Sequence, residues 1–207
     1  MQIKKALVLF LFFSTQSLGS SLMMDKEMVH ANLSPPKIGL REILPYRSAI
    51  RKDKQGEFYD TQRITAGILS RNKSIDTETA FRYAKLLVAA GKEFNLSPYL
   101  LAAIMIVESN GDRFAASRVA HGLMQINWNV HRSNISKAFP HIKTLQDLLL
   151  PENNIRVGAW LFSWHMKTSR KDLTKSLSLY LGGNSIKYTE KVLREKLFFE
   201  KIPLKQE

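Results

Sequence analysis

The segment from 151 to 167 constrains the fold of this chain more than any other stretch. It reads PENNIRVGAWLFSWHMK, and a helix built from it turns apolar side chains in every direction. A helix that is apolar all round is usually buried at the centre of a globular domain. Other elements must then pack around it, so the segment predicts a domain of packed helices.

Further helical patterns surround this segment, and residues of helix-capping type bound them. Asp76 and Ser97 are suitable N-caps, and Pro98 takes the first helical position, which proline favours. The pair Asn110 and Gly111 is a common helix end. Strand signals are minimal, so we expect a mostly α fold. The expected helices follow residue 75 and span about 98–109, 173–181 and 185–201.

The chain begins with the layout of a secretory signal peptide. Lys4 and Lys5 precede an unbroken apolar run at residues 6–13, and a small, polar stretch follows. The run is too short for a transmembrane helix, which needs about 20 apolar residues. We therefore expect residues 1–19 to be a signal peptide and the protein to be exported, in the periplasm or at the cell wall. An uncleaved anchor or a buried N-terminal strand is the alternative.

The length of 207 residues suits one compact domain with extensions, because one core usually serves roughly 100–200 residues. Residues 20–74 have weak periodicity and several prolines. We interpret them as a partly ordered N-terminal extension with a short helix near 61–69. Residues 75–198 are the expected helical domain, and residues 199–207 are a C-terminal tail.

Charge and composition narrow the class of partner. Lys and Arg number 31 against 18 Asp and Glu, a formal net charge of +13. This favours a nucleic acid, an anionic membrane or an acidic wall polymer, although a solvated basic surface explains it equally well. Expected export excludes nucleic acid. The chain has no cysteine, so it has no disulfide or Cys-based zinc site, and its histidines lack metal-binding spacing. We expect no metal and no cofactor.

Glu108 is an ionisable residue on an apolar helix face. In the expected helix it shares that face with Leu101, Ile104 and Met105. A carboxyl group there is costly unless it is paired or protonated, so its pKa should rise. A partly protonated carboxyl near neutral pH is what general acid catalysis on a glycosidic oxygen requires. The alternative is that Glu108 reaches solvent from the last turn, as most glutamates do.

Glu108-Ser109 is followed by Gly-Leu-Met-Gln-Ile at residues 122–126. Downstream stand the segments PENNI at 151–155, GAWL at 158–161, LYL at 179–181 and YTEKV at 188–192. In this order, these motifs resemble those of the soluble-type (SLT) lytic transglycosylases, a family with a lysozyme-like helical domain. The resemblance covers about residues 75–196, and it implies a lysozyme-like fold with an N-terminal extension.

The resemblance also implies a reaction. Glu108 would be the single acid/base residue and would protonate the leaving oxygen between MurNAc and GlcNAc in peptidoglycan glycan strands. The 6-hydroxyl of the same muramic acid would then attack, which gives 1,6-anhydro ends and needs no second carboxylate. The nearby Asp112 is better explained by turn chemistry.

The resemblance assigns substrate-binding roles to several residues around Glu108. Gln125 and the Met124 segment would contact the sugar N-acetyl group, and Gly122 would allow close backbone approach. Tyr180 would line the cleft, and Tyr188 would hydrogen-bond toward Glu108. Taken alone, each tyrosine would be a core ring with its hydroxyl at the surface. The full set is Ser109, Gly122, Met124, Gln125, Tyr180 and Tyr188.

Other functions stay open beside the lytic transglycosylase. A lysozyme-type hydrolase would use water on the same fold, and a non-catalytic wall-binding protein could retain the fold without the reaction. Leu181 supports the latter, because it stands where a typical member has Asn and cannot hydrogen-bond a sugar; Asn184 is a possible substitute. We expect a monomer, with a secretion or wall-assembly complex as a candidate partner.

Overall fold

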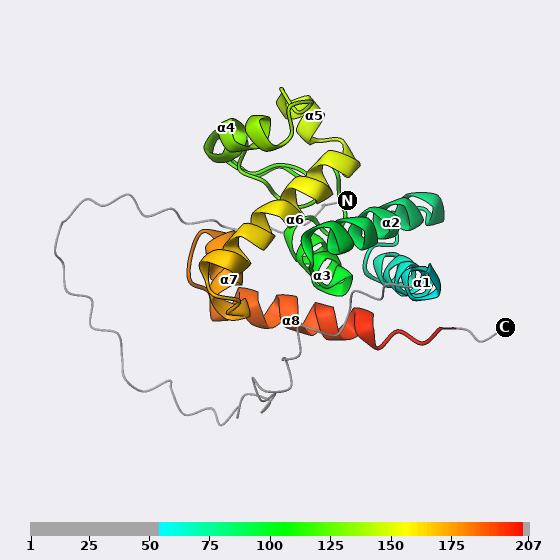
Figure 1. The fold of residues 1–207 in the computed structure, drawn as a ribbon. Helices are drawn as coiled ribbons and strands as arrows, with labels where there is room; N and C mark the ends of the chain where they lie inside the picture. Colours follow the sequence, from blue (N-terminus) through cyan, green and yellow to red (C-terminus); the bar gives the residue numbers. More distant parts are fainter. Residues whose placement is uncertain (1–53, 205–207) are drawn as a thin grey trace, which may run out of the picture. The chain divides into compact units, whose positions relative to one another are not determined.

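The computed structural model describes residues 54–204 (Figure 1). The expected signal peptide and residues 20–53 of the expected extension lie outside these residues. Within residues 54–204 the chain forms helices and no strand, so the prediction of a mostly α fold is confirmed. The helices are α1 (Lys54–Arg71), α2 (Thr77–Phe94), α3 (Pro98–Ser109), α4 (Trp128–Ala138), α5 (Leu145–Leu148), α6 (Pro151–Thr168), α7 (Leu173–Leu181) and α8 (Ile186–Glu200).

The most deeply buried helix is α3. Every residue from Pro98 to Ile106 is buried, and α3 packs against α1, α2 and α8. Helix α6, which the sequence placed at the centre, packs against α2, α5 and α7 and buries most of its length. Its side chain Trp164 is nevertheless 54% exposed. The core therefore has two apolar helices, and α2 packs against both of them.

The expected helix boundaries are confirmed by their capping contacts. The side chain of Asp76 accepts a hydrogen bond of 2.8 Å from the Thr79 N–H, and Ser97 caps α3. At the other end of α3, Asn110 takes the left-handed conformation with φ of 53°. Asparagine adopts this conformation more readily than most residues, so it ends a helix at little cost. The conformation of Asn110 therefore sets the direction in which the chain leaves α3.

Helix α1 is longer than the short helix expected near residues 61–69. It packs against α2, α3 and α8, and it places Ile64 and Ile68 in the core. Buried Asp60 accepts a hydrogen bond of 2.5 Å from the hydroxyl of Tyr99. The weak periodicity of the sequence follows from such buried polar residues, since they interrupt the apolar pattern that reveals a helix.

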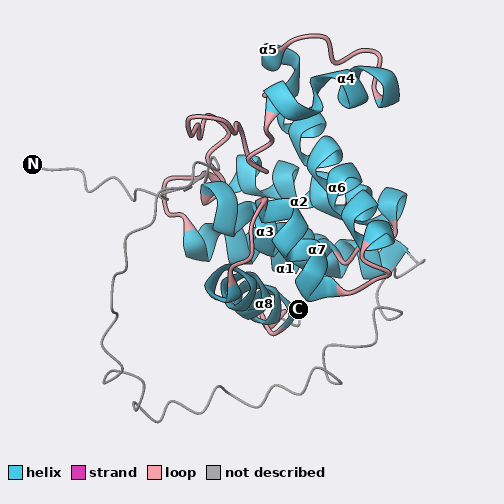
Figure 2. Cartoon of the chain, turned by 90° about the vertical axis from the view of Figure 1, so that its left-hand side faces the viewer, coloured by secondary structure: helices cyan, strands magenta, loops and turns pink. Residues whose placement is uncertain are grey.

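Helices α4 and α5 were not predicted from the sequence. In α4 only Ile135 is buried, so the helix lacks an apolar face to detect. Helix α5 has four residues and starts with a capping box between Thr144 and Asp147. Both lie at the end of α6 that is far from α7 and α8 (Figure 2). The loop between α3 and α4, residues 110–127, has only isolated bridges. Among the described helices, none has the length and apolar character to cross a membrane.

Candidate active site

Glu108 lies in the last turn of α3, where the packing of α8 against α3 brings Tyr188 to it. The Tyr188 hydroxyl donates a hydrogen bond of 2.6 Å to Oε1 of Glu108. The contact follows from the two helices' positions, because an apolar α3 must bury its face and α8 covers it. One carboxylate oxygen is thereby fixed by Tyr188.

Burial dominates the electrostatics of this pair. It raises the pKa of Glu108 from 4.5 to about 7, against the smaller opposing effects of the Tyr188 hydrogen bond and the positive charge of Lys191. The direction is the one expected from the apolar helix face. Burial also holds the pKa of Tyr188 well above its ordinary value, so the hydroxyl keeps its proton. At neutral pH the carboxyl of Glu108 is therefore present in both protonated and ionised forms.

The Gly-Leu-Met-Gln segment forms a tight turn within the 110–127 loop. His121 and Ile126 exchange backbone hydrogen bonds of 3.1 and 3.0 Å, and the Gln125 N–H donates to the Gly122 carbonyl at 3.1 Å. Gly122 and Gln125 have φ of 81° and 46°. The second value is uncommon for a residue with a side chain and costs free energy. Something must therefore hold Gln125 in place.

The side chain of Gln125 supplies that restraint. Its Nε2 donates to the carbonyl oxygens of Ala115 at 2.9 Å and Gly122 at 3.1 Å. An amide has only two N–H groups, so both serve the loop. The amide oxygen is then the atom that Gln125 can offer to a ligand. The two N–H groups of Gln125 therefore serve the loop backbone, and its amide oxygen has no hydrogen bond among these contacts.

Ser109 and Tyr180 fix the turn from two sides. The Ser109 hydroxyl lies 2.8 Å from the Leu123 carbonyl and 3.1 Å from the Met105 carbonyl, and it accepts a hydrogen bond from the Gly111 N–H. The hydroxyl of Tyr180, on α7, donates to the Met124 carbonyl at 2.9 Å. Both side chains join the turn to helices, and Ser109 does so directly beside Glu108.

Two expected substrate-binding residues face the protein interior. Met124 is fully buried and packs against α6 at Gly158, where an added Cβ would lie 2.6 Å from the Cβ of Met124. Its side chain therefore fills space between the turn and α6. At Gly122 an added Cβ would lie 2.3 Å from Nδ2 of Asn154. The glycine is required by a protein side chain as well as by its positive φ.

Asn154 is a residue of this site to which sequence analysis assigned no role. It is fully buried in the first turns of α6. Its Oδ1 accepts a hydrogen bond of 2.8 Å from the Met124 N–H, and its Nδ2 donates to the carbonyls of Leu148 and His121 at 3.1 and 3.3 Å. The sequence feature that could have indicated this role is the polar pair Asn153-Asn154 within a segment expected to be buried.

The other residues considered in the sequence are Asp112, Leu181 and Asn184. Oδ1 of Asp112 accepts from the Phe114 N–H at 2.8 Å, which is the turn chemistry expected for it. Leu181 is partly buried at the end of α7, and Asn184 is exposed. No group of three or more His, Cys, Asp or Glu residues within 54–204 is placed to hold a metal ion.

The helical fold, with Glu108 bonded to Tyr188 beside the Gly-Leu-Met-Gln turn, agrees with the lysozyme-like domain that the sequence resemblance implies. Comparison with family models identifies which kind. Residues 85–199, more than half of the 207 residues, match the Transglycosylase SLT domain. The chain belongs to this family, whose members are lytic transglycosylases acting on peptidoglycan, and the resemblance seen in the sequence is confirmed. No curated protein and no solved structure matched the chain.

Proposed function

We propose that this protein is a peptidoglycan lytic transglycosylase with Glu108 as its acid and base. It cleaves the β-1,4 bond between MurNAc and GlcNAc without water and leaves 1,6-anhydro-MurNAc ends. The observation that carries the proposal is the half-buried carboxyl of Glu108, which has a pKa of about 7 and accepts a hydrogen bond from Tyr188. The family match supports the same class of reaction.

A pKa near 7 suits a residue that must both give and take a proton. Protonated Glu108 donates its proton to the glycosidic oxygen while the bond from that oxygen to C1 of MurNAc breaks. The resulting carboxylate accepts the proton of the C6 hydroxyl as its oxygen bonds to C1. The proton on Glu108 is restored, so one carboxyl completes the reaction. Tyr188 orients the carboxyl through Oε1, which leaves Oε2 for the substrate.

Gln125 is proposed to orient the sugar. Its N–H groups are occupied by the Ala115 and Gly122 carbonyls, and so its oxygen is held in a fixed direction. We propose that this oxygen accepts a hydrogen bond from the N–H of an N-acetyl group. The turn that carries Gln125 is joined to the end of α3 by Ser109, one residue from Glu108.

We also propose that the protein acts outside the cytoplasm as a monomer. The substrate class of the family supports this location, and Lys4 and Lys5 before the apolar run at 6–13 support export. A secretion or wall-assembly complex is the proposed setting for a small enzyme of this type. Residues 75–198 are proposed as the catalytic domain.

The decisive experiment is digestion of purified peptidoglycan, with product analysis by mass spectrometry. Wild type should release anhydromuramyl products, about 18 Da lighter than hydrolysed ones because no water is added. Glu108→Gln should release the anhydromuramyl products at least about a thousandfold more slowly. Asp112→Asn is the matched control, since it removes a nearby carboxyl that serves a turn. Reducing ends would identify a lysozyme-type hydrolase, and an inert wild type would favour the non-catalytic wall-binding protein, with Leu181→Asn as the first reversion to test.

A further inference from the structure

A single buried side chain connects α6 to the turn that carries Gln125. Asn154 is fully buried, and its amide group contacts three backbone positions at once. Oδ1 accepts from the Met124 N–H at 2.8 Å, while Nδ2 donates to the carbonyls of Leu148 and His121. An amide is both donor and acceptor, so only Asn has the size and the polarity to satisfy all three positions.

The backbone of the turn is shaped to receive this side chain. Gly122 has a φ of 81°, and an added Cβ there would lie 2.3 Å from Nδ2 of Asn154. Of the two partners on the turn side, His121 precedes Gly122 and Met124 follows it. Asn154 therefore holds the turn on both sides of its glycine. A rigid turn of this kind limits where the next residue, Gln125, can point.

The backbone of Met124 and of its neighbour Leu123 is hydrogen-bonded to side chains of three helices, one of them beside Glu108. Its N–H is bound by Asn154, and its carbonyl is bound by Tyr180 at 2.9 Å. The neighbouring Leu123 carbonyl is bound by Ser109, which follows Glu108 in the chain. The turn is thus fixed by side chains from α3, α6 and α7. Of these three side chains, the one from α6 is fully buried, and the other two are partly buried.

We propose that Asn154 is a positioning residue for the glycan-cleaving reaction, acting through the backbone of Met124 to set the direction of Gln125. The inference rests on the proposed function, although the contact itself is independent of it. Loss of the contact leaves a buried N–H without a partner, and the turn then moves to reach water. Misplacement of a positioning group by about 1 Å can lower a rate by about a hundredfold.

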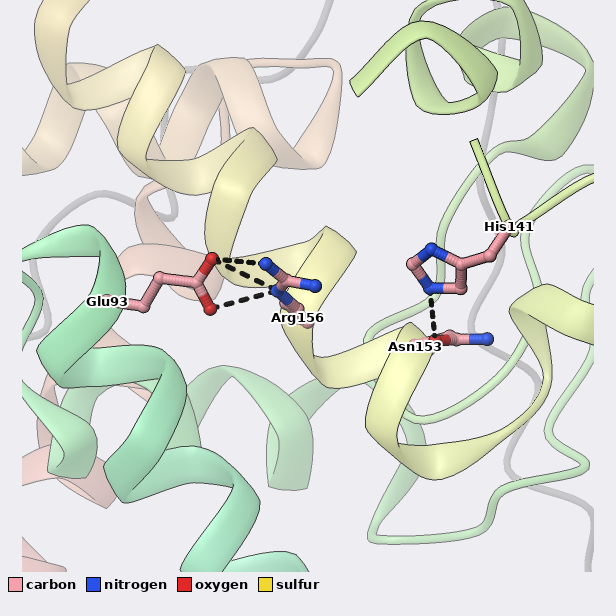
Figure 3. A network of polar contacts seen from close by, with 4 residues as sticks. All are labelled: Glu93, His141, Asn153 and Arg156. Carbon is pink, nitrogen blue, oxygen red and sulfur yellow. Dashed lines mark hydrogen bonds and ion pairs between the residues drawn. The ribbon is translucent and has the colours of Figure 1, made fainter. Parts of the chain in front are cut away.

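The neighbouring residue Asn153 provides a matched control. It has the same amide group, is also buried, and lies one residue away in α6. Its Nδ2 donates to the Asp147 carbonyl at 2.8 Å, and its Oδ1 lies 3.2 Å from Nε2 of His141 (Figure 3). These contacts hold the segment around α5 and do not touch residues 122–125. Asn153 thus tests what loss of a buried amide does to stability alone.

Asn154→Asp gives a signature that a general loss of stability would not give. When the aspartate side chain that this variant introduces is ionised, one of its oxygens can still accept a hydrogen bond from the Met124 N–H. Its other oxygen then faces the carbonyl oxygens of Leu148 and His121 and cannot donate to them. A protonated carboxyl can donate to one of them again. Because the group is buried, its pKa should lie above the ordinary value. The variant should therefore recover toward wild type as the pH falls from 8 to 5.

The experiment measures kcat and KM for anhydromuramyl release by the full chain, with Asn154→Asp, Asn154→Ser and Asn153→Asp. We expect kcat/KM of Asn154→Asp to fall between about tenfold and about a hundredfold at pH 8 and to recover toward pH 5, relative to wild type. Asn154→Ser should lose activity without that recovery, because serine does not titrate. Asn153→Asp should stay within about threefold of wild type, whatever its melting temperature. The serine variant keeps the test decisive if the aspartate variant is unfolded at pH 8.

Two results would overturn the proposal: wild-type kcat/KM at pH 8 in either folded Asn154 variant, or an equal loss in Asn153→Asp at equal stability. Backbone amide NMR separates this failure from failure of the proposed function. If wild type releases no anhydro products, the positions of the Gly122–Gln125 amide resonances still decide the inference. They should move in Asn154→Ser and stay in place in Asn153→Asp, and unmoved resonances in Asn154→Ser would end it.

Discussion

Helix α1 and the 110–127 loop are held in place by different means. Helix α1 is fixed by burial: Ile64 and Ile68 are fully buried, and Gly67 lies so close to Phe199 that an added Cβ would approach it to 2.2 Å. The loop is fixed by side chains that hydrogen-bond to its backbone, from helices on several sides. Packing of the first kind stabilises the fold, and bonding of the second kind sets atomic positions at the site.

The difference has a practical consequence for the domain boundary. Helix α1 lies before residue 85, where the family match begins, yet it supplies part of the core. Its buried Asp60 is bonded to Tyr99 of α3, the helix that carries Glu108. We therefore infer that α1 is needed for the fold of the catalytic domain and contributes nothing to its chemistry. The predictions below test this separation.

The largest expected effect is on activity and comes from the site. Glu108→Gln should lower kcat for glycan cleavage by about a thousandfold or more, because general acid–base catalysis contributes about 100- to 10,000-fold and this residue performs both roles. In wild type, kcat/KM should fall as the pH rises through about 7, where the carboxyl of Glu108 loses its proton. A pH–rate profile over pH 5–9 measures this. A profile with no decline near 7 would contradict the assignment of Glu108 as the acid.

The next effect is on stability and comes from α1. Ile68→Ala should lower the free energy of unfolding by about 2–5 kcal/mol, because it removes a fully buried side chain and leaves a cavity. The kcat of the folded fraction should be unchanged. Urea unfolding at 25 °C gives the first quantity, and initial rates well below the unfolding transition give the second. Loss of kcat in fully folded Ile68→Ala would break the proposed separation between α1 and the site.

Gly122→Ala should affect both quantities, because this position is part of the loop and is also packed against Asn154. A φ of 81° strains any residue with a side chain, and the new methyl group would displace Asn154. We expect a loss of about 1–3 kcal/mol in stability, together with reduced kcat/KM. Thermal unfolding and the anhydromuramyl assay measure the two effects. The exposed Gly183, where an added Cβ meets nothing within 4 Å, is the control position.

The sequence predicted the helices that show a regular spacing of apolar residues and the helix ends that carry capping residues. The helices α3 and α6 were recognisable from their apolar residues, and the end of α3 from Asn110. The raised pKa of Glu108 followed from its helix face. The contacts of Asn154 could not be predicted, because they join α6 to a loop distant in sequence through backbone atoms, which every residue type carries. The same holds for the full length of α1, whose buried polar residues conceal its pattern.

The smallest expected effect concerns stability at the site itself. A raised carboxyl pKa means that the folded state binds the proton more tightly than the unfolded state, whose pKa is 4.5. Stability contributed by Glu108 is therefore full below pH 4.5 and is lost as the pH rises through about 7. Glu108→Gln has no charge to bury and can still accept the Tyr188 hydrogen bond. It should match wild type near pH 4 and exceed it at pH 8 by about 1–3 kcal/mol.

Urea unfolding of both proteins between pH 4 and pH 8 measures this difference. The control is Glu190→Gln, which removes the same charge from an exposed position of α8. An equal gain in both variants would show that net charge is the cause, since burial affects only Glu108. A gain confined to Glu108→Gln would show that the active site lowers the stability of the fold at the pH where Glu108 is ionised. Burial would then have opposite effects on the free energy of unfolding within one domain. The buried side chains of α1 raise it, and the ionised carboxyl of Glu108 lowers it.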